Sequence, residues 1–211
     1  MKYDSLIFDL DGTLWDTCSA CALAWNKVLE RNMIEFRQIV PDDIRKVAGK
    51  SHHECISEVF KGLDSQTLAV LSEQTAVEDN LLIRKLGGTI YRGVKNGLEK
   101  LGRCYPIFIV SNCQDGYIET FLEFSGFHPY FKDYESWGRT GKRKSENLKT
   151  ISARNGLKAP VYIGDTMGDY TSAKEAGIPF IHVSYGFGQV PHVPSFDTFT
   201  GLTDSLLTAS M

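Results

Sequence analysis

The chain has 211 residues, of which 42% are hydrophobic and 23% are charged, and its formal net charge at pH 7 is −3. A chain of this length can bury one sizeable core, either as a single domain or as a domain with a smaller insert. The mild acidity gives no sign of binding to nucleic acid or membranes, so we expect neither partner. The N-terminal apolar run is too short for a signal peptide, and no stretch approaches the roughly 20 apolar residues of a membrane-spanning helix.

Residues 4–9 form the first predicted element, a largely apolar run typical of a buried strand. Two acids, Asp9 and Asp11, stand at its end and precede Gly12. Carboxylates resist burial unless they are paired or bound to a metal, so a buried strand has no structural use for them at its tip. Because ligands bind at the carboxyl ends of strands in open α/β sheets, a binding site is favoured over a surface turn.

Residues 15–87 contain no convincing strand. Their apolar residues recur at helical spacing, which predicts four or five helices, and Pro41 followed by two acids suits the start of one of them. Cys18 and Cys21 form a Cys-x-x-Cys pair, but neither a second ligand pair nor a thioredoxin-like context accompanies it. We interpret them as small buried side chains of a helix, and the odd total of five cysteines indicates reduced thiols in the cytoplasm.

Beyond the break at Gly87-Gly88, from about Tyr91, helices alternate with apolar strands. Such alternation, with strands that do not alternate in polarity, predicts an α/β fold with a parallel sheet covered by helices on both faces. The first strand is expected to join this sheet, which leaves residues 15–87 as a helical insert. The expected elements are helices at 94–101, 116–123, 146–155 and 167–176 and strands at 106–110, 160–163 and 180–183.

Ser111 and Asn112 follow the apolar run 107–110, so a hydroxyl and an amide stand where a second strand is predicted to end. This pattern is ambiguous by itself, because either side chain can simply cap the helix that follows.

Lys142, Arg143 and Lys144 form a cationic cluster ahead of the helix predicted at 146–155. Lysines at a helix N-terminus oppose the helix macrodipole, so an anionic group is expected nearby. A solvated basic turn is the alternative.

Asp165 and Asp169 form a second pair of acids, after the apolar run 161–163 and Gly164. Asp165 is expected at the strand tip and Asp169 one helical turn later, so that both can face one point. Thr166 and Asp169 can also form an acidic variant of a capping box, and the two interpretations can hold together.

These four motifs stand in order, each at a predicted strand or helix boundary. The run Asp9-Leu10-Asp11-Gly12-Thr13-Leu14 resembles the D-x-D-G-T-L signature of the haloacid dehalogenase-like superfamily, and Gly164-Asp165 with Asp169 matches its G-D-x-x-x-D motif. Within this superfamily the chain closely resembles phosphoglycolate-phosphatase-like hydrolases, and the resemblance covers the chain apart from its last few residues. It implies a Rossmann-like catalytic core of residues 1–14 and 88–211 and a small all-helical cap of residues 15–87.

The resemblance also implies a role for each motif. Asp9 would be the nucleophile that forms an aspartyl-phosphate, and Asp11 would be the general acid and base. The phrase Lys-x-x-Asn-Leu places the lysine of the third motif at Lys144, whereas another alignment fits Lys142. The implied catalytic residues are Asp9, Asp11, Ser111 and Lys144, and the implied substrate-binding residues are Ser111, Asn112, Lys144 and Gly12. The implied metal ligands are Asp9, Asp165 and the main-chain carbonyl of Asp11. Asp169 is expected to hold these residues in place without binding the metal directly.

We therefore expect a Mg²⁺-dependent phosphatase, monomeric or weakly dimeric, that hydrolyses a small-molecule phosphate monoester such as phosphoglycolate or a sugar phosphate. The acid at position 11 excludes the carbon-attacking dehalogenases of the superfamily, which lack it. Two alternatives stay open: a phosphohexomutase of the β-phosphoglucomutase kind, and a phosphate-binding regulator without turnover.

Three further segments are weaker candidates for contact with the substrate. Lys50 and Trp15 could face the leaving group from the insert, although Trp15 could also only pack against a helix of the insert. His52-His53 is interpreted as a pair of exposed polar residues in a turn. The loop 185–188 resembles a loop beside the site in phosphoglycolate-phosphatase-like members.

Overall fold

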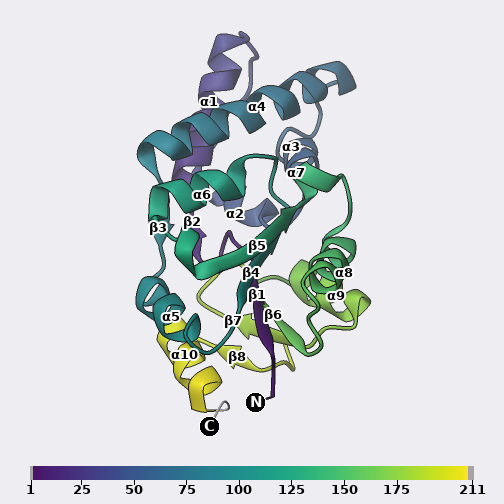
Figure 1. Cartoon of the computed structure of the whole chain (residues 1–211). Helices are drawn as coiled ribbons and strands as arrows, with labels where there is room; N and C mark the ends of the chain where they lie inside the picture. The colour runs from purple at the N-terminus through teal and green to yellow at the C-terminus, as the bar shows by residue number, and fades with distance from the viewer. Residues whose placement is uncertain (1, 209–211) are drawn as a thin grey trace.

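The apolar strands predicted from the sequence belong to one six-stranded sheet in the computed structural model, which describes residues 2–208 (Figure 1). Neighbouring strands run parallel in the order β5-β4-β1-β6-β7-β8, so β1 lies between two strands that are far from it in sequence. The predicted α/β fold is confirmed. The strands are β1 (Ser5–Phe8), β4 (Ile107–Ser111), β5 (Phe131–Ser136), β6 (Pro160–Gly164), β7 (Phe180–Val183) and β8 (Ser195–Phe196).

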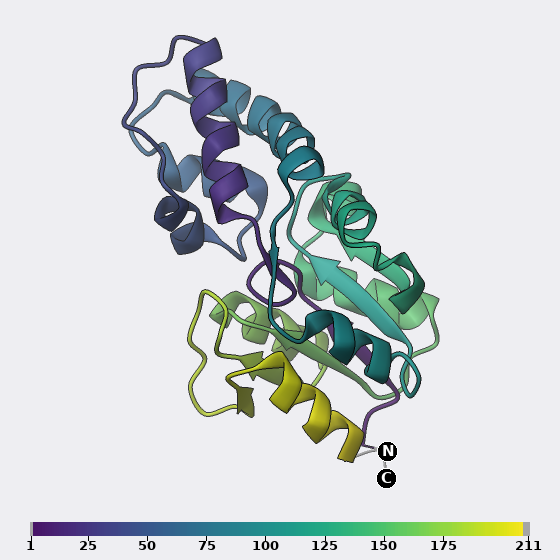
Figure 2. The same ribbon diagram turned by 90° about the vertical axis from the view of Figure 1, so that its left-hand side faces the viewer.

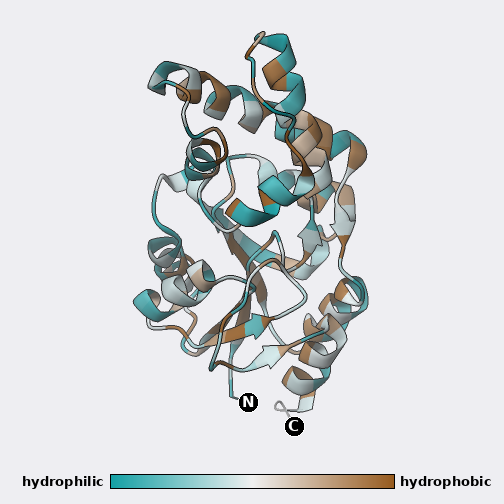
Figure 3. Ribbon diagram, turned by 180° about the vertical axis from the view of Figure 1, so that it is seen from behind, coloured by the Kyte–Doolittle hydropathy of each residue, from teal (hydrophilic) through white to brown (hydrophobic). Residues whose placement is uncertain are grey.

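Both faces of the sheet are buried, as expected for parallel strands. Leu6 and Phe8 of β1 pack into one apolar cluster, whereas Ile7 between them packs into another on the opposite face. Figure 3 shows hydrophobic strands enclosed by helices of mixed polarity. Each large side chain buried in this way contributes about 1.5–3 kcal/mol. The first face is covered by α5 (Val94–Leu101), α6 (Tyr117–Ser125) and α10 (Phe199–Thr208), and the second by α8 (Lys144–Arg154) and α9 (Met167–Ala176).

Four helices separate the first strand from the rest of the sheet, in agreement with the four or five predicted. They are α1 (Cys18–Arg31), α2 (Pro41–Val47), α3 (His52–Val59) and α4 (Ser65–Leu86). Helices α1 and α4 pack along each other, and the four helices together stand apart from the sheet layer (Figure 2). Cys18 and Cys21 are buried free thiols of α1, as interpreted from the sequence.

The chain enters and leaves these helices through a two-stranded antiparallel ribbon. β2 (Trp15–Asp16) pairs with β3 (Thr89–Ile90), and Trp15 lies opposite Ile90. The prediction that residues 15–87 contain no strand is therefore wrong at its first two residues. Such a short strand has no periodicity of its own, because it exists only through a partner on the far side of the helical insert.

Several short or irregular elements had no sequence prediction. β5 is an edge strand whose side chains are partly charged and half-exposed, so it lacks a continuous apolar pattern. β8 has only two residues, and α10 contains Gly201, which weakens a helical pattern. The remaining elements are a 3₁₀ turn at His128–Tyr130 and α7 (Trp137–Thr140).

None of the helices in the described part of the chain has both the length and the apolar character needed to cross a membrane.

Candidate active site

Three parallel strands end beside one another and bring the predicted motifs together. β1 lies between β4 and β6, and Asp9, Ser111 and Asp165 stand at the carboxyl ends of these strands. All three side chains are buried. The motifs that contain Asp9, Ser111 and Asp165 therefore lie at one edge of the sheet, the edge at which ligands bind in open α/β proteins.

The third motif reaches this edge through Lys144, the first residue of α8. Its Nζ donates to Asp9 Oδ1 at 2.8 Å and to Asp169 Oδ1 at 2.6 Å, and all three side chains are buried. Burial lowers the pKa of Lys144, but the carboxylates of Asp169 and Asp9 outweigh burial and raise it, so the amine keeps its charge. Lys142 is exposed. The geometry supports the choice of Lys144, and its catalytic role stays a prediction.

Both carboxylate oxygens of Asp169 are occupied by donors. Oδ1 accepts from Lys144 and from the Tyr162 hydroxyl at 3.3 Å. Oδ2 accepts from Thr166 Oγ1 at 2.6 Å and from the main-chain N–H groups of Thr166 and Asp165 at 3.0 and 3.3 Å. The capping box that the sequence allowed is present and coexists with the ion pair. Burial raises the pKa of Asp169, but Lys144 and these hydrogen bonds prevail and lower it. Asp169 thus holds Lys144 and the tip of β6 in place.

A divalent cation fits between the acids at the strand ends. Carboxylate oxygens of Asp9, Asp165 and Asp169 lie within 4.8 Å of one another. Burial and the charges of Asp169 and Asp9 raise the pKa of Asp165 well above its usual value, which reflects repulsion that a cation would relieve. The predicted ligands of the ion, Asp9, Asp165 and the main-chain carbonyl of Asp11, stay a prediction, and Asp169 lies beside them. This all-oxygen set suits Mg²⁺.

Gly12 is required by the close approach of Asp165. Its φ is +82°, and a Cβ atom at this position would lie 2.2 Å from Asp165 Oδ2. Asp165 is itself held by the main-chain N–H of Phe187 at 2.7 Å and by Thr13 Oγ1 at 3.3 Å. The loop 185–188 therefore lies beside the site, as its resemblance predicted. A contact between Gly12 and the substrate stays a prediction.

Asp11 is held by hydroxyl groups rather than by a cation. Its Oδ1 accepts from the Tyr117 hydroxyl at 2.7 Å and from Thr17 Oγ1 at 3.1 Å. Burial raises the pKa of Asp11 to about 6, and the hydrogen bonds from Tyr117 and Thr17 act against this rise. Sequence reasoning missed both partners, because Tyr117 begins α6 and Thr17 precedes α1 without belonging to any motif. The only signal was the position of Thr17 shortly after the D-x-D turn.

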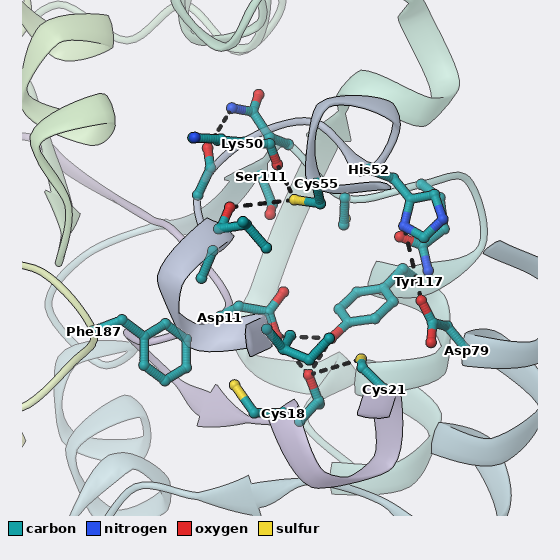
Figure 4. A pocket seen from close by; sticks show the side chains of 18 of the residues that line it. Asp11, Cys18, Cys21, Lys50, His52, Cys55, Asp79, Ser111, Tyr117 and Phe187 are labelled. Atoms are coloured by element: carbon teal, nitrogen blue, oxygen red, sulfur yellow. Dashed lines mark hydrogen bonds and ion pairs between the residues drawn. The ribbon is translucent and has the colours of Figure 1, made fainter. Parts of the chain in front are cut away.

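A cavity of about 80 Å³ opens between the strand ends and the helical insert (Figure 4). It is small beside the roughly 300–1,000 Å³ of typical ligand pockets, so it suits a compact ligand. Asp9, Asp11 and Ser111 line it from the sheet, and Cys18, Cys21, Lys50, His52 and Asp79 line it from the insert.

Asn112 also lines the cavity, but its side chain joins the sheet to the insert. Its Nδ2 donates to the main-chain carbonyl of Gly49, in the turn between α2 and α3, at 2.8 Å. The amide donor that was predicted to bind the substrate is therefore already engaged, and Ser111 is left as the hydroxyl of this motif that faces the cavity.

Two expectations for the insert need correction. His52 was interpreted as exposed, but only 8% of it is accessible, since it begins α3 behind the Ser51–Glu54 capping box and its ring turns toward α4. Trp15 does not line the cavity. It is fully buried against the rings of Tyr117 and Phe121.

Comparison with known proteins agrees with this geometry. A family model described as haloacid dehalogenase-like hydrolase matches residues 6–183. The chain belongs to the haloacid dehalogenase-like hydrolase family. The resemblance predicted from the motifs is thereby confirmed.

Similar proteins cover the chain almost completely. The phosphoglycolate phosphatase of Psychrobacter arcticus is 25% identical over 227 residues, which cover 99% of this chain and 98% of that protein. The phosphoglycolate phosphatase of Rhodobacter capsulatus is 27% identical over 210 residues, 94% of each chain. A solved haloacid dehalogenase-like family protein from Streptococcus pneumoniae has the same fold, with a TM-score of 0.79 at 17% identity over 100% of this chain and 99% of that one.

Lys144→Ala should lower kcat for an aryl phosphate by a hundredfold or more, on the order of the loss of a preorganised charge stabiliser. Lys142→Ala, two residues away and exposed, is the matched control and should change kcat little. Thermal melts of both variants should accompany the kinetics, because loss of Lys144 leaves two buried carboxylates without a cation. The reverse ranking would move the catalytic role to Lys142.

Tyr117→Phe should lower kcat by roughly fivefold to tenfold and leave KM nearly unchanged, since it removes one hydrogen bond that orients Asp11. Tyr130→Phe, in the turn before β5, is a control for loss of a hydroxyl elsewhere. Steady-state kinetics on both variants decide the matter. An unchanged kcat in Tyr117→Phe would mean that Thr17 alone positions Asp11.

Proposed function

We propose that this protein is a Mg²⁺-dependent phosphatase that hydrolyses a small-molecule phosphate monoester through an aspartyl-phosphate on Asp9. The observation that carries the proposal is the buried contact between Lys144 and Asp9, with Asp9 and Asp11 lining one cavity and a carboxylate oxygen of Asp165 within 4.8 Å of one of Asp9. The curated relatives named phosphoglycolate phosphatase support the same reaction class.

In this proposal Asp9 attacks phosphorus in line with the leaving oxygen, which divides one difficult displacement into two easier steps. Lys144 and Ser111 stabilise the negative charge on the phosphoryl oxygens. Held by Asp9, Asp165 and the main-chain carbonyl of Asp11, Mg²⁺ would neutralise charge on the phosphoryl group as it approaches the anionic nucleophile.

Asp11 moves the protons of both half-reactions. It gives a proton to the leaving oxygen in the first step and takes one from the attacking water in the second. A pKa near 6 suits a group that must do both near neutral pH, and the Tyr117 and Thr17 hydroxyls fix the carboxyl group while it does so.

Residues 15–87 act as the cap of this site, and residues 1–14 and 88–211 form the catalytic core. The cap supplies the lining of the cavity opposite the strand ends and would exclude bulk water once a substrate is bound. The small cavity supports a compact leaving group, in the size range of phosphoglycolate or a small sugar phosphate.

The function is tested by incubating the protein with a panel of phosphate esters and measuring released inorganic phosphate. Mg²⁺ should support release, excess chelator should abolish it, and added Mg²⁺ should restore it. Transfer of phosphate to a second hydroxyl of the substrate without release would indicate a phosphohexomutase instead. Full activity in chelator would contradict the proposed metal dependence.

Asp9→Asn should abolish turnover and the covalent phosphoryl label, because a neutral amide is not a nucleophile. Asp11→Asn should slow both half-reactions and still allow the label to form slowly on Asp9. Rapid-quench labelling followed by mass spectrometry distinguishes the two variants. A label in Asp9→Asn equal to that of the wild type would place the nucleophile elsewhere.

A further inference from the structure

The cap end of the cavity holds a second acidic group that the proposed reaction does not use. Asp79 of α4 and His52 of α3 line the same cavity as Asp11, and only 2% of Asp79 is accessible. Figure 4 shows Asp79 and His52 on the side of the cavity where Cys21 and Tyr117 also lie.

One carboxylate oxygen of Asp79 lacks a strong donor. Oδ2 accepts from Trp25 Nε1 at 3.2 Å, whereas Oδ1 is buried and meets no N–H or O–H donor within the described part of the chain. The thiol of Cys21, a weak donor, lies close enough to lower the pKa of Asp79 and donates to Thr17 Oγ1 at 3.7 Å. A buried carboxyl oxygen without a hydrogen bond is unfavourable, so a ligand that donates to it would bind more tightly.

His52 does not supply the donor that this oxygen lacks. The Thr75 hydroxyl donates to the Leu71 carbonyl at 2.6 Å, so its oxygen accepts from His52 Nε2 at 2.8 Å. Burial lowers the pKa of His52 to about 4, which leaves the ring neutral and its Nδ1 an acceptor.

This Nδ1 faces Asp79 Oδ2 at 3.8 Å. This distance is too long for a hydrogen bond, so a proton on the carboxyl group of Asp79 can lie on either oxygen. Burial raises the pKa of Asp79 well above its usual value, which favours a proton on this group. Oδ1 of Asp79 therefore accepts when the carboxyl group is ionised and can donate when it is protonated, so a hydroxyl group can serve it in both states.

The cavity also contains a donor without a partner. Gln114 Nε2 is buried and has no hydrogen bond among the described residues, and Gln114 lines the same cavity. A small ligand that both donates and accepts would satisfy Asp79 and Gln114 together. A hydroxyl group does both, whereas an ammonium group only donates and a carboxylate only accepts.

We propose that Asp79 and Gln114 recognise a hydroxyl group of the leaving alcohol, so that the preferred substrate is a compact hydroxylated (polyol or small sugar) phosphate rather than phosphoglycolate. The inference rests on the proposed phosphatase function. The charge of the cavity agrees with it: Asp9 and Asp11 line the cavity, and Lys50, which also lines it, is paired with Glu58. The carboxylate of phosphoglycolate would therefore enter an acidic cavity in which Lys50 is already engaged.

Three two-carbon esters test the proposal on the wild-type protein with Mg²⁺. They are 2-hydroxyethyl phosphate, 2-phosphoglycolate and O-phosphoethanolamine, which differ only in the group carried by the second carbon. The value of kcat/KM should be highest for 2-hydroxyethyl phosphate, by about tenfold or more over phosphoglycolate, as expected when a buried polar group is left unpaired or repelled. A higher value for either of the other two esters would overturn the proposal.

Asp79→Asn then assigns the preference to this residue. The amide keeps an oxygen for Trp25 Nε1 and presents an N–H donor to the cavity, so the ratio of kcat/KM between 2-hydroxyethyl phosphate and phosphoglycolate should fall by about tenfold. Glu73→Gln, exposed on the same helix, is the matched control and should leave the ratio unchanged. An equal ratio in Asp79→Asn and the wild type would overturn the proposal.

The two proposals fail in different ways. Hydrolysis of p-nitrophenyl phosphate with Mg²⁺, together with the wrong ranking of the three esters, would leave the phosphatase function standing and remove the role of Asp79. Absence of hydrolysis for every ester would remove both. The ranking in the wild-type protein requires no variant to fold, and melting curves of Asp79→Asn separate a loss of stability from a change in preference.

Discussion

The buried contact of Lys144 with Asp9 and Asp169 is the constraint on which the rest of the site depends. An unpaired charge among these buried side chains would cost several kcal/mol, so each of the three charged groups stabilises the others. The lysine comes from α8 on one face of the sheet, and the acids come from the end of β1 and the start of α9. The contact therefore fixes the relative positions of three elements that are distant in sequence.

The same contact gives two neighbouring acids different surroundings. Asp9 faces the ammonium group of Lys144, whereas Asp11, two residues later, faces the hydroxyls of Tyr117 and Thr17. Burial and the charge of Asp169 raise the pKa of Asp9 to about 7 and prevail over Lys144, which acts to lower it, while burial raises the pKa of Asp11 to about 6. Acid–base chemistry on this short segment requires Asp9 to ionise more readily than Asp11, and a divalent cation bound beside Asp9 would supply that separation.

Elements with a continuous apolar pattern could be predicted from the sequence, because burial of that pattern decides their structure. The helix at 94–101 and the strand at 180–183 have the predicted bounds. The helix at 167–176 does as well, although its only buried side chains are Asp169 and Ala173. The acids at the strand ends could be predicted because topology alone brings those ends together. The partners Tyr117 and Asp79 could not, since they approach the site only after α6 and α4 pack, and the burial of His52 depends in the same way on α4.

The ribbon of β2 and β3 has a consequence for how the chain is assembled. Its paired residues place the two crossings of the chain side by side, about 4.5–5.5 Å apart as in any antiparallel pair. A gap of this width can be closed by a hairpin turn of two residues. The segment of 72 residues from Thr17 to Gly88 therefore begins and ends at nearly the same place. It is an insertion at one point of the domain that contains the six-stranded sheet. The pairing of β2 with β3 holds the two ends of this segment together whatever its length, so the space above the strand ends can change in shape while Thr17, at the start of the segment, keeps its hydrogen bond to Asp11.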